Sequence, residues 1–328
     1  DDIIRKQPSR SKMYEWTVPI ISGTALIVGS GLTIYIDRLE RLRDTSSPRP
    51  VMYRFFSQAI LAIHQWPHWI FVITCNIFGP CFFLTAIWQA SLLENQCTGQ
   101  VCSSLASALR MDGWVTSVSL YLDAWIPLGR PVITHISHTI VAIGFFVFGI
   151  HYVYNTILVA KILAAKDDNY GILEQQMLVN LRTTFLAIMV ISGLVIAVTT
   201  SPAVQAHGRL LDHQFRGTKE SQMKQLDIIK CRRLEACMST AQMVLGIGLG
   251  LTQVTAAVDV FKLMENNSSA GDKRHIIAEE FWAIPMFVIM LSLTIMEYLY
   301  RHKIYNWCQA MLLRFRMTPH NSNKIKTD

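Results

Sequence analysis

Long apolar stretches separated by short charged segments dominate this chain. The clearest stretch is 132–165, VITHISHTIVAIGFFVFGIHYVYNTILVAKILAA, whose centre at 139–150 has no charged side chain. A helix needs about 20 mostly apolar residues to cross a bilayer. The pattern therefore predicts a membrane-spanning helix here, against which the other apolar segments pack.

The same pattern predicts further membrane segments at 16–36, 69–93, 185–204, 238–263 and 279–301. Pro80 predicts a kink in the second, and the sequence TTSP at 199–202 predicts a helix stop. The segment 114–128 is short and contains Asp123, so it is either a membrane helix with a polar face or an interfacial helix. The predicted fold is an all-α polytopic transmembrane helix bundle of six or seven helices. It comprises a polar segment 1–16, the bundle 17–301 and a basic amphipathic tail 302–328.

Composition supports a multi-pass integral membrane protein. Of 328 residues, 51% are hydrophobic and 16% are charged, against about 25% charged in soluble domains. The net charge is +7, but the Lys and Arg side chains lie between apolar segments, as in the basic loop 205–237, and in the tail. This arrangement is typical of cytosolic membrane loops, and the chain has no nucleic-acid-binding motif. We expect an endomembrane or plasma-membrane location.

Cysteines and sequons bear on orientation. Cys97 and Cys102 lie in a polar loop predicted at 94–113 and could form a disulfide if that loop is lumenal. Asn266 and Asn267 begin two overlapping N-glycosylation sequons, a weak sign that their loop is lumenal and the protein a glycoprotein. Seven segments would place both basic loops in the cytosol, whereas six would place the first outside. Charge therefore favours seven.

A few polar residues fall within or beside the apolar segments. His135 and His138 are three residues apart and share a helix face, and Asp123 lies close in sequence. Together they could ligate zinc, or form a polar, lipid- or ligand-facing cluster near one membrane face. We favour the cluster and add Glu280, at the head of the last helix. No metal or cofactor is firmly implied, and bound lipid is expected.

Other polar or small residues have simpler interpretations. His138 and His151 are spaced as two haem levels would be, but no other segment offers a second histidine pair. Asp259, beside Lys262, is expected to reach the interface. Gly246 and Gly250 form a G-x-x-x-G step, which permits close helix packing or local flexibility.

The order of features resembles the Frag/DRAM/Sfk family of six-span eukaryotic membrane proteins. Three stretches carry the resemblance: 53–55 through His64 and Pro67, the helix at 133–162, and the pair LRTTFLAIMVISGLVIAV and HIIAEEFWAIPMFVIMLSL. The last pair is similar to the family's final two helices. Residues 205–273 depart from the pattern, because they insert an extra apolar segment where the family has a short loop. The resemblance implies lipid handling or regulation without settled catalytic residues.

The expected function is therefore that of a lipid-handling or lipid-regulatory membrane protein, not a classical enzyme, since no Walker, Rossmann, G-x-S-x-G or H-E-x-x-H motif occurs. Its expected partners are membrane lipids and a further copy or another membrane protein. The alternatives are an ion channel, receptor or transporter subunit with a cytosolic basic coupling loop, and a metal-dependent membrane lipid hydrolase.

Overall fold

The computed structural model describes residues 16–43, 66–97, 99–125, 132–166, 172–216 and 221–267. These residues form the helices α1 (Thr17–Arg43), α3 (Trp66–Gln96), α4 (Gln100–Trp125), α5 (Val132–Lys166), α6 (Ile172–Arg216) and α7 (Ser221–Asn267). The chain divides into residues 1–283 and 284–328, and every described residue lies in the first unit. The predicted all-α fold is confirmed for the described part of the chain.

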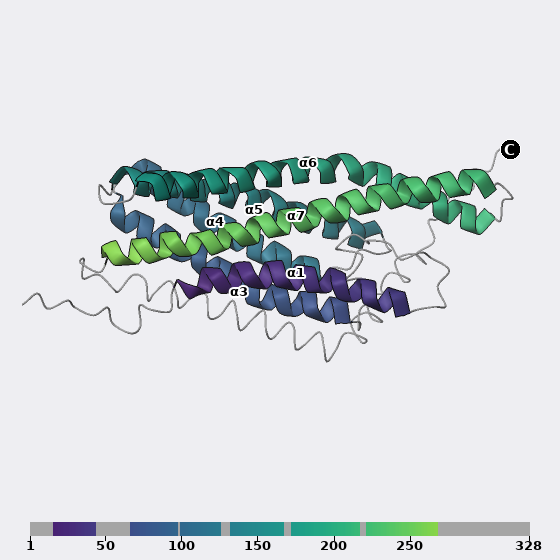
Figure 1. The fold of residues 1–328 in the computed structure, drawn as a ribbon, viewed down its shortest axis with the longest axis horizontal. Coiled ribbons are helices and arrows are strands. Elements are labelled where there is room, and N and C mark those ends of the chain that lie inside the picture. Colours follow the sequence, from purple (N-terminus) through teal and green to yellow (C-terminus); the bar gives the residue numbers. More distant parts are fainter. Residues whose placement is uncertain are drawn as a thin grey trace, which may run out of the picture. The chain divides into compact units, whose positions relative to one another are not determined.

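The described helices lie side by side as a bundle (Figure 1). In the order α1, α3, α4, α5, α6, α7, each helix contacts the next, and α7 closes the ring on α1. Helix α3 also contacts α7 across the ring. The most buried membrane segments are those of α3 and α7, and the least buried is that of α6. Helix α6 is thus peripheral, with α3 and α7 at the centre.

Five of these helices are long and apolar enough to cross a membrane. Their candidate spans are Thr17–Glu40, Trp66–Ser91, Ser137–Ile162, Gln176–Thr199 and Ala236–Phe261, each of 24 to 26 residues. At 1.5 Å per residue these lengths correspond to about 36–39 Å, which exceeds a hydrocarbon core of about 30 Å. Helix α4, which contains residues 114–125 of the predicted 114–128 segment, is not among the five. The predicted segment 279–301 lies outside the described residues.

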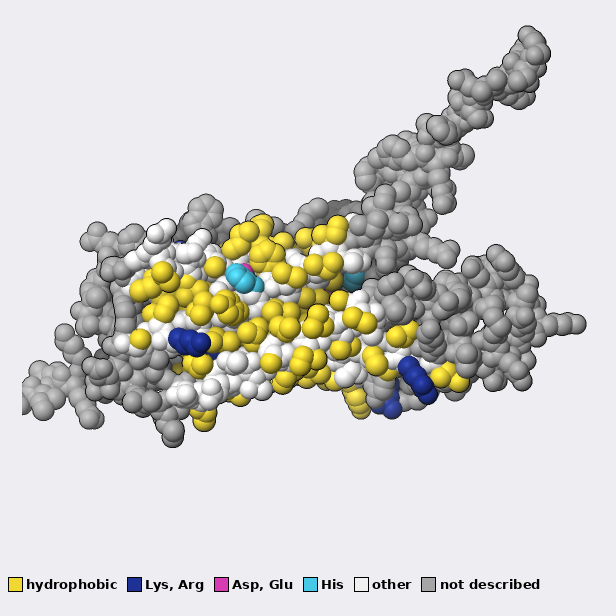
Figure 2. Space-filling model, turned by 90° about the horizontal axis from the view of Figure 1, so that it is seen from above, with side chains coloured by type: hydrophobic (Ala, Val, Ile, Leu, Met, Phe, Trp, Pro, Cys, Tyr) yellow, Lys and Arg dark blue, Asp and Glu magenta, His cyan; other side chains and the backbone are white. Residues whose placement is uncertain are grey.

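The bundle exposes many apolar side chains and buries polar residues beside its hydrophobic core. Exposed hydrophobic residues recur at helical spacing, as in Ile188, Ile191, Leu194 and Val198 of α6. On the face shown in Figure 2, hydrophobic side chains cover most of the described surface. The buried set includes the polar residues Ser22, Thr33, Thr85, Gln89, Thr116, Asn155, Arg182, Thr252 and Asp259. Lipid outside and hydrogen-bonded polar groups inside account for this distribution.

Small residues let the helices approach closely. A Cβ added to Gly250 of α7 would lie 2.6 Å from Cγ1 of Ile27 and 2.9 Å from the carbonyl oxygen of Gly23, both on α1. Such an atom on Gly246 would lie 4.0 Å from Oγ of Ser30, its nearest neighbour. Within the predicted G-x-x-x-G step, Gly250 therefore makes the tight contact, and its partner glycine is on α1.

Two predicted boundaries were wrong. Helix α4 begins at Gln100, so most of the predicted cysteine loop is helical. Buried Cys102, Leu105, Ala106 and Leu109 provide its inward face at a spacing of three and four residues. Helix α6 continues through the predicted stop at 199–202 to Arg216, and α7 begins at Ser221. The basic segment 205–237, predicted as a helical loop, is helical over its described residues and belongs to the ends of α6 and α7.

Helices α3 and α4 are joined tightly where they meet. Cys97 and Cys102 form a disulfide with a Cα–Cα distance of 5.9 Å. Arg110 donates two hydrogen bonds to Glu94, of 2.8 and 2.7 Å. The hydrogen bonds from Arg110 lower the pKa of the Glu94 carboxyl, against the opposing effect of partial burial. These covalent and ionic contacts fix the short connection between the two helices.

Candidate functional site

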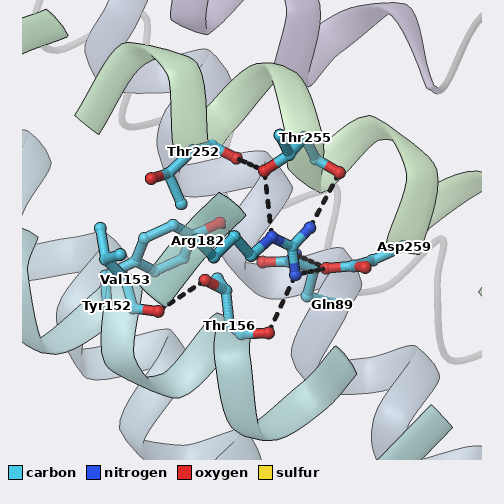
Figure 3. Close-up of polar contacts among 8 residues, drawn as sticks. All are labelled: Gln89, Tyr152, Val153, Thr156, Arg182, Thr252, Thr255 and Asp259. Atoms are coloured by element: carbon cyan, nitrogen blue, oxygen red, sulfur yellow. Dashed lines mark hydrogen bonds and ion pairs between the residues drawn. The ribbon is translucent and has the colours of Figure 1, made fainter. Parts of the chain in front are cut away.

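An arginine and an aspartate meet in the bundle interior. Arg182 on α6 and Asp259 on α7 are 0% and 1% exposed, and Nη1 of the arginine lies 2.8 Å from Oδ2 of the aspartate. Figure 3 shows the guanidinium directed at Asp259 and at the α7 backbone. Unpaired charge is costly in lipid, so each residue provides the neutralising charge that the other requires.

The guanidinium of Arg182 makes three further hydrogen bonds. Its Nε donates to Oγ1 of Thr255 at 3.0 Å, and its Nη2 to the carbonyl oxygen of Thr255 at 2.8 Å. Its Nη1 also donates to the carbonyl oxygen of Thr156 on α5, at 2.9 Å. All three guanidinium nitrogens thus donate to protein acceptors. The side chain holds the peripheral helix α6 to α5 and α7.

The network extends to α3. Gln89 donates through Nε2 to Oδ2 of Asp259 at 3.1 Å and accepts from the hydroxyl of Tyr152 at 2.6 Å. Four helices, α3, α5, α6 and α7, therefore share one buried chain of hydrogen bonds. We call Gln89, Tyr152, Arg182 and Asp259 the interior clamp. These shared hydrogen bonds between four helices suit a structural role.

A second acidic residue, Asp123 on α4, pairs with His138 on α5. Nδ1 of the histidine lies 3.3 Å from Oδ1 of the carboxylate. Asp123 also borders a cavity of about 40 Å³, together with Ser30, Gln242 and three phenylalanines. A cavity of this volume has room for one or two water molecules. Asp123 and His138, predicted as parts of one polar cluster, are brought together by the antiparallel packing of α4 and α5.

A third acidic residue, Asp112 on α4, is held by two donors from α5. Nδ1 of His151 lies 2.8 Å from Oδ1 and 3.0 Å from Oδ2 of the carboxylate. The amide of Asn155 donates to Oδ2 at 2.8 Å. The Asp112 side chain is 1% exposed, whereas that of His151 is 52% exposed. The aspartate therefore anchors the inner edge of a histidine ring whose outer edge is accessible.

The accessible edge of His151 borders an open groove of about 580 Å³ between α4 and α5. Gln100, Ser103, Ser104 and Ser107 line its α4 side, and Met111 and Phe148 add apolar surface. From Gln100 to Asp112 the groove follows about 18 Å of α4 at 1.5 Å per residue. We call this feature the α4–α5 groove. Its lining combines hydrogen-bonding groups with the apolar side chains of Met111 and Phe148.

The remaining predicted site residues are less informative. His135 lies in α5, but its side chain is not among those described, and Glu280 lies outside the described residues. Asn266 and Asn267 form the end of α7, and their side chains are likewise not described. No group of three or more His, Cys, Asp or Glu residues suited to a metal ion occurs in the part of the chain that the structure describes.

Sequence reasoning missed the interior clamp and the Asp112–His151 pair. Asp259 was predicted to reach the interface, but it is buried against Arg182. The available signal was Arg182 itself, which lies within the candidate span Gln176–Thr199. An arginine in such a span requires an acidic partner on another helix. For Asp112, the signal was hidden because its segment was interpreted as a loop.

Comparison of the chain with protein-family models, with curated proteins and with solved structures gives no match. The resemblance to the Frag/DRAM/Sfk family therefore stays a prediction, and the geometry of the α4–α5 groove is the basis for a function.

Proposed function

We propose that this multi-span membrane protein binds membrane lipid in the α4–α5 groove and thereby takes part in lipid handling or its regulation. The observation that carries the proposal is the lining of the groove. A line of exposed Gln100, Ser103, Ser104 and Ser107 leads to His151, beside the apolar Met111 and Phe148. A lipid has the same two parts, a hydrogen-bonding headgroup and apolar chains.

The position of the groove along the bundle supports this proposal. His151 lies in the candidate span Ser137–Ile162, about 21 Å from its first residue and about 16 Å from its last along the helix axis. The serines of α4 extend from that level toward the Cys97–Cys102 disulfide. The groove thus provides polar groups from one end of the bundle to the middle of a span. At that depth the acyl chains of the bilayer offer a headgroup no hydrogen bonds, whereas these side chains do.

The same arrangement supports a membrane position for α4. Ser117 donates to the carbonyl oxygen of Gly79 at 2.9 Å, and Arg110 pairs with Glu94. Helix α4 therefore follows α3 over most of its length. We propose that α4 crosses the membrane with its polar face on the groove, although its composition is less apolar than that of the five candidate spans.

This crossing also orients the chain. The disulfide lies at the end of the bundle where α3 meets α4, and the basic segment of α6 and α7 extends from the opposite end. Disulfides persist in oxidising compartments, and basic loops favour the cytosol. Both signals support an orientation in which the disulfide end of the groove faces the lumenal or external side.

Photo-crosslinking tests the proposal. The full-length protein is reconstituted in vesicles that contain a phospholipid with a diazirine in its acyl chain, and adducts are mapped by mass spectrometry. We expect adducts concentrated at Met111 and Phe148, and their loss in Ser107→Trp, whose indole fills the groove. The matched control is Thr183→Trp on the exposed face of α6, which should keep them. Adducts spread evenly over all exposed helix faces, or unchanged in Ser107→Trp, would show only annular lipid.

A further inference from the structure

The hydrogen-bonding groups of the α4–α5 groove also bear on which headgroup it accepts. On the α4 wall, Ser103, Ser104 and Ser107 present hydroxyls and Gln100 an amide. Asp112 is the only carboxylate among the residues that line the groove. Both of its oxygens already accept hydrogen bonds, from His151 and Asn155. A cationic headgroup amine would therefore find no available carboxylate, whereas an anionic oxygen would find several donors.

His151 is the strongest of these donors. Its Nδ1 is committed to the buried Asp112 at 2.8 Å, so Nε2 is the ring nitrogen that can meet a ligand from the exposed side. With Nδ1–H donated to Asp112, Nε2 is an acceptor in the neutral imidazole and a donor only in the ring protonated on both nitrogens. Asp112 fixes the orientation of the ring and balances the positive charge of that doubly protonated form. Such a ring donates a charge-assisted hydrogen bond, which is shorter and stronger than a neutral one.

The fixed position of the ring also favours recognition. Asn155 lies one helical turn after His151, and its amide holds Oδ2 of Asp112 at 2.8 Å. The ring of Tyr154 stacks on the imidazole with 6.4 Å between centroids. The histidine is thus supported from within the protein before any ligand arrives. A ligand that contacts Nε2 would not need to order the side chain, which reduces the entropic cost of binding.

We infer that the α4–α5 groove selects lipids whose headgroup carries a phosphate, with His151 donating to a phosphate oxygen and the serine hydroxyls of α4 completing the contact. This inference depends on the proposed lipid-binding function and adds the chemical class of the headgroup. It makes His151 the residue that determines specificity, and Asp112 and Asn155 the residues that position it.

Two lipids that differ only in the phosphate provide the test. Phosphatidic acid and diacylglycerol with identical acyl chains are each titrated into the purified full-length protein, and bound lipid is counted by native mass spectrometry. We expect wild type to prefer phosphatidic acid by about tenfold or more, the factor that one hydrogen bond to a charged group provides. His151→Asn should lower phosphatidic acid binding to the level of diacylglycerol and so remove this preference.

Controls separate the possible outcomes. Lys161→Ala removes an exposed cation of the same helix and should keep the preference; its loss there would assign the effect to surface charge and overturn the inference. Excess inorganic phosphate should not displace phosphatidic acid, and displacement would identify a site for free phosphate. Equal binding of both lipids in wild type, or a preference that survives in His151→Asn, would refute the headgroup assignment alone. Failure of both lipids to bind would refute the proposed function.

Discussion

Removal of the Arg182 side chain tests the role of the interior clamp. Arg182→Ala deletes an ion pair to Asp259 and hydrogen bonds to Thr255 and Thr156. Hydrogen bonds measured within membrane proteins average about 0.6 kcal/mol, so three of them contribute about 2 kcal/mol. The buried aspartate also loses its counter-charge, and breaking a buried pair costs about 3–5 kcal/mol. These two values overlap in what they count, so we use them as limits and do not add them. We expect Arg182→Ala to lower the unfolding free energy by about 2–5 kcal/mol.

A double-mutant cycle isolates the charge pair from the packing. Asp259→Leu alone should cost about as much as Arg182→Met alone, because each leaves one buried charge without its partner. The double variant should cost clearly less than the sum, since two apolar side chains need no counter-charge in the same space. Thr183→Val is the matched control on α6. The Thr183 hydroxyl donates to the carbonyl oxygen of Val179 one turn earlier, and the effect of its removal should stay below about 0.5 kcal/mol.

The assay is reversible unfolding of the purified protein in mixed micelles, with an increasing fraction of denaturing detergent and helicity as the signal. The reasoning is refuted if Arg182→Ala shifts the unfolding free energy no more than the Thr183 control. It is equally refuted if the two charge-removing variants combine additively. Either result would mean that apolar packing, and not the clamp, holds α6 in place.

Two further substitutions test separate contacts. Gly250→Ala should lower the unfolding free energy by about 1–3 kcal/mol through overpacking against α1. The control is Gly31→Ala, whose added methyl meets open space and which should be neutral or stabilising by up to about 1 kcal/mol. Equal effects of the two substitutions would contradict the close α1–α7 contact. Glu94→Gln should cost up to about 1 kcal/mol at pH 7. Because the folded pKa of Glu94 is lowered, that stabilisation is present above the unfolded pKa of about 4.3 and is lost as the pH falls through the folded pKa. Unfolding curves of wild type and Glu94→Gln that diverge further in acid would contradict the pairing.

The positions of the membrane helices could be predicted because hydrophobic length is a property of the chain itself. The stretch at 132–165 became α5, with its bounds at Val132 and Lys166. Helix ends were less predictable. Pro202 and the polar residues around it indicated a stop, but a helix that leaves the hydrocarbon region can continue in water, where solvent satisfies the backbone groups that proline frees.

The polar contacts were harder to predict, because they depend on the rotation of separate helices. Whether Asp259 meets solvent or Arg182 is decided by how α6 and α7 pack, and one sequence contains no measure of that rotation. Helix α4 illustrates a different limit. Its inward residues Leu105 and Leu109 follow a helical period, but the serines at 103, 104 and 107 resemble a loop in a sequence read for hydrophobic runs.

The interior clamp and the α4–α5 groove both contain a buried carboxylate, yet their surroundings assign them different roles. Beside Asp259, every guanidinium nitrogen of Arg182 donates to a protein acceptor, so a ligand could bind this arginine only by breaking bonds that hold α6. Around Asp112 the donors are equally fixed, but the ring of His151 that satisfies the carboxylate is half exposed. A buried acid that orients an accessible imidazole leaves that imidazole positioned to contact a ligand. Substitutions at Arg182 should therefore act on stability first, and those at His151 on lipid selectivity with the fold intact.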